Sequence, residues 1–191
     1  MANNARQSQG MHHGGFTLLE ALVVLAVLGV LLGLAVPVLQ GLRERQQLQA
    51  EAEDFWSSLM LARAQALLAQ QHVTVCAVSA AGVCQATAGG PAGWHGGWQV
   101  FVDANRNGQR EGDERLLQQR SGSPARVRIT GNSTVSRTIG YGADGRSESL
   151  SGAFQAGTVT VCAAGQSAGW QVVINALGRP RLEKTETPNC P

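Results

Sequence analysis

A single carboxylate, that of Glu20, interrupts an otherwise apolar stretch over residues 16–39. As an α-helix this stretch is about 36 Å long, which is enough to cross a bilayer's hydrocarbon core. A carboxylate within that core costs about 3 kcal/mol and needs a partner. Cleavage between Gly15 and Phe16 would create one, because the new α-ammonium group of Phe16 can pair with Glu20 in the same chain or in a neighbouring one.

A second polar constellation fits the calcium-loop template D-x-[DN]-x-[DN]-G-x5-E. Asp103, Asn105 and Asn107 supply side-chain oxygens, Gly108 permits the turn, and Glu114 can bind a cation with both carboxylate oxygens. The segment before the loop has the pattern of a strand, however, where an EF-hand has a helix. Asn-Gly and Gly-Asp steps are also common turn formers. The sequence therefore leaves two interpretations open, a calcium site and an ordinary turn, and it predicts no other cofactor.

The four cysteines are Cys76, Cys84, Cys162 and Cys190. None forms a C-x-x-C pair and no histidine lies at zinc-finger spacing, which argues against a metal site. In an exported domain they would be oxidised. Three pairings are possible; proximity along the chain favours Cys76–Cys84 and Cys162–Cys190.

The elements that position these groups are a long helix followed by a β-rich domain. Beyond Pro37 and Gly41 the apolar pattern narrows to one helical face, and the helix is expected to continue to about His72. The stripe residues recur at gaps of three and four: Leu48, Ala52, Phe55, Leu59, Ala62, Ala66 and Ala69.

Short β patterns separated by glycine-rich connectors follow this helix. The expected strands are 72–78, 98–102, 115–119, 125–130, 135–141, 158–163 and 169–175. Because no strand–helix–strand alternation is present, the sheet should be mainly antiparallel and the fold class α+β. Hydrophobic residues at 43% and 24 glycines favour a loop-rich globular domain over a disordered tail.

The residues at the start of the chain resemble a known signal. Gly15-Phe16-Thr17-Leu18-Leu19-Glu20 before an apolar helix is similar to the class III signal of type IV pilins and pseudopilins. Together with Gly-Trp-Gln-Val-Phe-Val-Asp at 97–103 and Gly178-Arg179-Pro180-Arg181 near a terminal Cys-Pro, it resembles the GspH/FimT family of type II secretion pseudopilins and minor type IV pilins.

This resemblance implies a non-enzymatic minor pilin or pseudopilin that helps a filament to assemble. Prepilin peptidase would cut after Gly15 and N-methylate Phe16, and Glu20 would pair with a Phe16 amine during assembly. The implied organisation is a leader at 1–15, a transmembrane and filament-core helix at 16–39, its amphipathic continuation at 40–71, and a periplasmic β-rich domain at 72–191. The implied location is the bacterial inner membrane, crossed once, with other pilins as partners through the helix.

An alternative function is DNA binding during natural transformation. In the FimT branch of this family a C-terminal Gly-Arg-x-Arg element contacts DNA, and Gly178-Arg179-Pro180-Arg181 matches it. The planar guanidinium groups of Arg179 and Arg181 suit phosphate. The net charge is only +2, although basic residues outnumber acidic ones after Glu114.

A third function, that of a membrane-anchored enzyme, is not supported by any catalytic motif. The sequence has neither a G-x-S-x-G elbow nor an H-E-x-x-H pair, and His72 and His95 have no acid or nucleophile near them in sequence.

Overall fold

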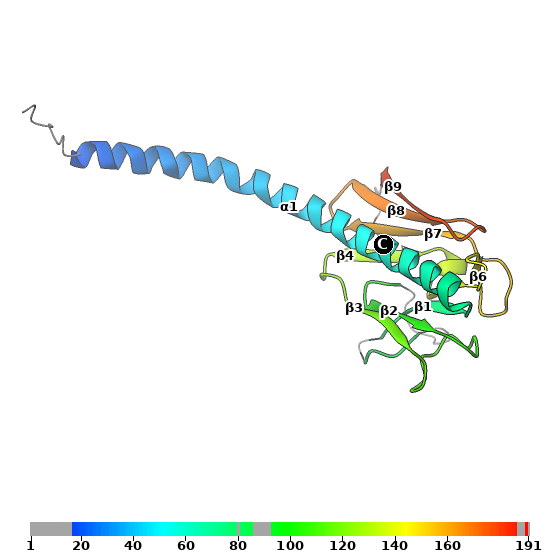
Figure 1. Cartoon of the computed structure of the whole chain (residues 1–191). Helices are drawn as coiled ribbons and strands as arrows, with labels where there is room; N and C mark the ends of the chain where they lie inside the picture. Colours follow the sequence, from blue (N-terminus) through cyan, green and yellow to red (C-terminus); the bar gives the residue numbers. More distant parts are fainter. Residues whose placement is uncertain (1–16, 80, 86–92, 187–189, 191) are drawn as a thin grey trace, which may run out of the picture. The chain divides into compact units, whose positions relative to one another are not determined.

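A computed structural model describes residues 17–79, 81–85, 93–186 and 190, with side chains omitted for residues 34–40. The chain divides into two units, Met1–Arg43 and Glu44–Pro191. The second unit contains every strand of the described residues, and the helix α1 passes through both units (Figure 1).

Helix α1 comprises Leu18–Ala69. Thr17 precedes it as an N-cap, since its hydroxyl oxygen accepts the backbone N–H of Glu20 at 3.2 Å. At the other end Gln70 adopts a left-handed backbone with φ of 53°. Its side-chain amide donates a hydrogen bond to the carbonyl of Leu67 at 2.8 Å. The helix therefore ends a few residues before the expected end near His72, because this left-handed residue breaks the repeat.

The predicted stripe of α1 faces the core. Ala69 is half-buried, and the other six of its seven residues are buried: Leu48, Ala52, Phe55, Leu59, Ala62 and Ala66. At its centre the ring of Phe55 lies edge-on to Trp94 at 5.0 Å and to Trp98 at 5.2 Å. Trp98 also donates its indole N–H to the hydroxyl of Ser58 at 2.9 Å, so this polar atom is satisfied inside the core.

The strands form two antiparallel sheets, and Figure 1 shows β7, β8 and β9 side by side in the second. The first sheet has the order β3 (Leu116–Ser121), β2 (Gly97–Val102), β1 (Val73–Ala77), β5 (Thr138–Tyr141), β6 (Ser147–Glu148). The second has the order β4 (Val127–Gly131), β7 (Gly157–Ala163), β8 (Ala168–Ile174), β9 (Pro180–Glu186). Side chains of both sheets, such as Val75 and Ile129, share one core with the α1 stripe. The predicted α+β, mainly antiparallel fold is confirmed.

Two strands were missing from the sequence prediction. β6 has only two residues, too few for a periodic pattern. β9 is an edge strand whose residues 181–186 are mostly exposed and charged, so it lacks apolar alternation. The prediction of a strand at 135–141 was also too long, because Ser133–Val135 forms the short 3-10 helix η1 and β5 begins at Thr138.

Both favoured disulfides are present, Cys76–Cys84 and Cys162–Cys190. The first closes a short loop after β1, beside a small second cluster with Val78 and Phe101. The second joins Cys190, the residue before the last one of the sequence, to strand β7 across a sequence separation of 28. Proximity in sequence therefore selected the correct pairing.

Buried Tyr141 of β5 makes alkaline stability testable. Burial raises the pKa of its phenol, and the positive charge of Arg63 partly opposes the shift. A pKa raised in the folded state gives stability that is present below the ordinary value near 10 and is lost as the pH rises toward the folded-state pKa.

We therefore expect tyrosinate absorbance above about pH 10 to appear only together with unfolding. The chain contains a single tyrosine, so the signal reports this side chain alone. Its hydroxyl has no hydrogen-bond partner among the described residues, and Tyr141→Phe should accordingly keep more of its stability at high pH than the wild type. Tyrosinate formation at pH 10 with an unchanged circular dichroism spectrum would contradict this expectation.

Candidate functional site

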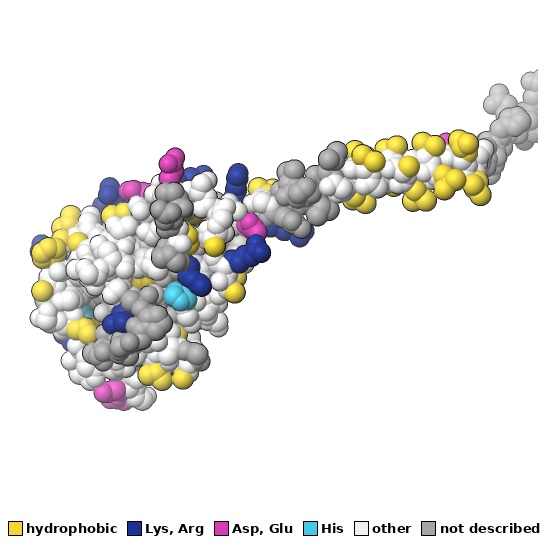
Figure 2. All heavy atoms as spheres, turned by 180° about the vertical axis from the view of Figure 1, so that it is seen from behind, with side chains coloured by type: hydrophobic (Ala, Val, Ile, Leu, Met, Phe, Trp, Pro, Cys, Tyr) yellow, Lys and Arg dark blue, Asp and Glu magenta, His cyan; other side chains and the backbone are white. Residues whose placement is uncertain are grey.

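The N-terminal unit is a helix whose described apolar side chains are exposed. All described side chains from Thr17 to Gly33 are exposed; Leu18 is 79% and Leu32 61% exposed. Figure 2 shows these apolar side chains along the helix on the face in view. In the part of the chain that the structure describes, no helix combines the length and apolarity required of a membrane span.

Glu20 lies in the first turn of α1, where the helix dipole favours a negative charge. Thr17 and Glu20 have the spacing of a capping box, and the Thr17 half of it is formed. The carboxylate of Glu20 has no ion-pair partner among residues 17–79, 81–85, 93–186 and 190. Gly15 and Phe16 lie outside the described residues, so cleavage and the pairing of Glu20 with Phe16 stay predictions.

The loop between β2 and β3 contains the calcium template. Its first residue, Asp103, is fully buried, and both of its carboxylate oxygens are engaged. One oxygen accepts the Thr74 hydroxyl at 2.7 Å and the Gly108 N–H at 3.0 Å; the other accepts the Asn107 N–H at 3.1 Å. Gly108 has φ of 71°, which explains the glycine at this turn.

The other template oxygens also accept hydrogen bonds from the loop backbone. The Asn105 side-chain oxygen accepts the N–H of Asn107 at 3.0 Å. The Asn107 side-chain oxygen accepts the N–H of Gln109 at 2.7 Å. Glu114 accepts the N–H of Ala104 at 3.1 Å and of Glu111 at 3.0 Å.

These hydrogen bonds make the loop a self-capped turn, and this turn explains why the template positions carry side chains with oxygen acceptors. No group of three or more His, Cys, Asp or Glu side chains in the described residues is placed to hold a metal ion. A calcium ion would have to compete with the loop's own N–H donors, and calcium binding stays a prediction.

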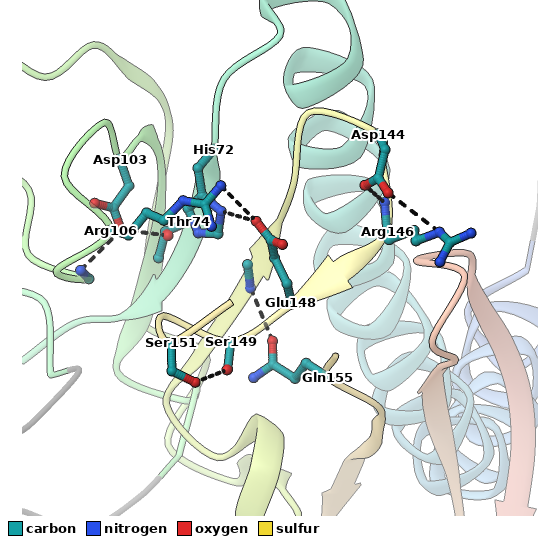
Figure 3. A network of polar contacts seen from close by, with 12 residues as sticks. His72, Thr74, Asp103, Arg106, Asp144, Arg146, Glu148, Ser149, Ser151 and Gln155 are labelled. Atoms are coloured by element: carbon teal, nitrogen blue, oxygen red, sulfur yellow. Dashed lines mark hydrogen bonds and ion pairs between the residues drawn. The ribbon is translucent and has the colours of Figure 1, made fainter. Parts of the chain in front are cut away.

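A polar network that the sequence does not reveal joins this loop to β6 (Figure 3). Glu148 accepts from His72 at 2.8 Å and pairs with Arg106 of the loop at 3.3 Å. Figure 3 shows both side chains directed toward the same carboxylate oxygen. His72 and Glu148 are 76 positions apart in the sequence, so no local pattern could have indicated this contact.

The Gly-Arg-x-Arg element lies at the turn into β9. Gly178 has φ of 73° and its backbone lies against the carbonyl oxygen of Gly145, where a Cβ atom would collide. Arg179 and Arg181 are both exposed. The Arg181 side chain is 66% exposed, and its guanidinium lies 3.6 Å from the carboxylate of Glu183. Between them, the Pro180 carbonyl accepts the indole N–H of Trp56 at 3.0 Å.

Arg126 and Arg146, two other basic residues in the part of the chain after Glu114, are paired with acids. Arg126 lies 3.0 Å from Glu44, and Arg146 lies 3.4 Å from Asp144. The two exposed arginines at the β9 turn therefore do not extend into a purely basic face through Arg126 or Arg146.

Solved structures share this fold of a helix packed against two antiparallel sheets. The type IV minor pilin FimU of Pseudomonas aeruginosa (strain PAO1) matches in two crystal forms, with TM-scores of 0.55 and 0.52 at 22% and 20% identity. The matches cover 73% and 71% of this chain and 90% and 91% of FimU. The minor pseudopilin EpsH from the type II secretion system of Vibrio cholerae matches with a TM-score of 0.50 at 12% identity, covering 72% of this chain and 93% of EpsH. The fold is therefore that of minor pilins and pseudopilins.

The sequence itself matches two family models. Residues 51–178 match Type II transport protein GspH, and residues 10–36 match the prokaryotic N-terminal methylation motif. No curated protein sequence matches the chain. The chain belongs to the GspH family, as the resemblance predicted, and is a membrane-anchored minor pilin or pseudopilin.

Proposed function

We propose that this chain is a non-catalytic subunit that enters a type IV pilus or a type II secretion pseudopilus through its N-terminal half-helix. The observation that carries the proposal is the apolar surface of α1 before Gly33, on which every described side chain is exposed. A helix that is apolar on all sides is stable only in lipid or among other helices. The inner membrane supplies the first of these environments, and a filament core of packed helices supplies the second.

The proposed sequence of events begins with insertion across the inner membrane as a single span, with the β-rich domain in the periplasm. Prepilin peptidase cuts after Gly15, which frees the α-ammonium group of Phe16, and N-methylates this group. In the filament, Glu20 pairs with a Phe16 ammonium and its charge is neutralised. The N-terminal methylation motif at residues 10–36 and the isolated carboxylate in the apolar run support this order.

Replacing Glu20 tests this assembly step. We expect Glu20→Ala and the isosteric Glu20→Gln to remain in the membrane and to be processed, but to fall about tenfold or more in isolated filaments, because an unpaired ammonium would stay buried. Asp113→Ala removes an exposed acid outside the helix and is the matched control. Quantitative immunoblots of membrane and filament fractions provide the measurement; unchanged incorporation of Glu20→Gln would contradict the pairing.

DNA binding by Arg179 and Arg181 is the alternative role, favoured by the exposure of both side chains at the β9 turn. Binding through phosphates should be independent of sequence and weaken steeply with salt. We expect the double variant Arg179→Gln with Arg181→Gln to lose most gel-shift affinity for duplex DNA at low salt. Arg126→Gln, which removes an acid-paired arginine, is the control. A double variant that binds as well as the wild type would reject this role.

A further inference from the structure

A hollow in the second unit lies between helix α1 and the edge strand β9. It has a volume of about 580 Å³ and is lined from α1 by Glu53, Trp56 and Ser57 and from β9 by Pro180, Arg181 and Leu182. β9 is the last strand of its sheet, paired only with β8 in the described structure. The hollow therefore adjoins a sheet edge that no described strand covers.

The backbone of β9 shows which residues face this edge. The Pro180 carbonyl points toward α1, where it accepts the indole N–H of Trp56 at 3.0 Å. Because main-chain groups alternate in direction along a strand, the N–H and C=O of Leu182 face the same open side. Leu182 thus offers one donor and one acceptor at the edge, on the side away from β8, and no turn or loop group of the described residues bonds to either.

The side chains around this edge favour one kind of ligand. Trp56 and Leu182 are both half-buried against the core and form an apolar base. On the α1 side, Asp54 is already paired with Arg120 at 2.9 Å, whereas exposed Glu53 accepts only the Gln49 amide in the described structure. Arg181, the basic side chain of the lining, lies 3.6 Å from the carboxylate of Glu183 on its own strand, so the Glu53 carboxylate is available for a basic side chain of the ligand.

We propose that this groove binds an extended segment of a neighbouring filament subunit, which adds as a strand to β9. The segment would pair with the main chain of Leu182, place an apolar side chain over Trp56 and direct a lysine or arginine to Glu53. The identity of the partner as a filament subunit rests on the proposed function.

A synthetic strand peptide tests the groove without requiring filaments. The probe is a capped heptapeptide of alternating valine and threonine with one central lysine, titrated into the isotope-labelled full chain in zwitterionic lipid nanodiscs. Backbone NMR shifts should change at Leu182 and Lys184 and leave β4, the strand at the opposite edge of the same sheet, unaffected. N-methylation of the peptide amides that face β9 should weaken binding about tenfold, because each blocks a main-chain hydrogen bond.

Two protein variants test the charge preference. Glu53→Gln should weaken binding of the lysine peptide about two- to fivefold, and Asp113→Asn should leave it unchanged. Shifts located away from β9, equal binding of the N-methylated peptide, or no binding would each overturn the proposal. Self-association of the chain through β9 would also overturn it, in favour of a dimer. These outcomes are independent of Glu20, so a failure of the assembly proposal would appear in filament incorporation while peptide binding persisted.

Discussion

Phe55→Ala is expected to lower the free energy of unfolding by about 3–5 kcal/mol. Phe55 is fully buried at the centre of the α1 stripe, and its ring lies between Trp94 and Trp98. Truncation removes the aromatic contacts and leaves a cavity where the helix meets both sheets. The measurement is urea unfolding of the full chain in detergent, followed by tryptophan fluorescence.

Two controls show whether the loss arises from this packing. Phe55→Leu keeps most of the volume and should cost less than about 1.5 kcal/mol. Leu68→Ala changes a side chain of the same helix that is 78% exposed and should shift the free energy by less than about 0.5 kcal/mol. A Phe55→Ala variant as stable as Leu68→Ala would contradict the structure of the core.

Asp103→Ala is expected to cost about 3 kcal/mol, because it leaves the Thr74 hydroxyl and the N–H groups of Asn107 and Gly108 without their acceptor. Asp103→Asn retains one side-chain oxygen and should lose about half as much. Asp113→Ala, in the same loop but exposed, should have little effect. Thermal unfolding and the rate of proteolysis within 103–114 measure both stability and loop order; equal values for the Asp103 and Asp113 variants would refute the cap.

Calcium provides a second readout from these same variants. If the template binds calcium, millimolar calcium should raise the melting temperature of the wild type and leave that of Asp103→Asn unchanged. An unchanged wild-type melting temperature, together with no heat in a calorimetric titration, would reject the metal and leave the self-capped turn as the function of these residues.

Local periodicity was enough to predict the elements in which apolar residues recur at a regular spacing. The α1 stripe from Leu48 to Ala66 was predictable because helical spacing alone places those residues on one face. β9 was not predictable in this way, since an edge strand with exposed charges shows neither a helical nor a strand pattern. It became recognisable only through its pairing with β8.

The site residues divide along the same line. The template from Asp103 to Glu114 revealed which oxygens gather in one loop, but not which groups they bind, because that depends on where the backbone N–H groups point. The contact between His72 and Glu148 depends on how β1 pairs with β5 and how β5 pairs with β6, which no short motif specifies. The groove beside β9 likewise depends on tertiary structure.

The placement of the two disulfides has a mechanical consequence. Cys76–Cys84 and Cys162–Cys190 both lie within the β-rich part, and neither joins a strand to α1. Tension that enters through the helix, as in a retracting fibre, passes to the sheets through the main chain at residues 70–72, which joins α1 to β1, and through noncovalent contacts such as those of Phe55. Neither route includes a disulfide. Under such a load the helix can detach while both covalent loops remain closed, so reducing agents should change the rupture force of this junction little.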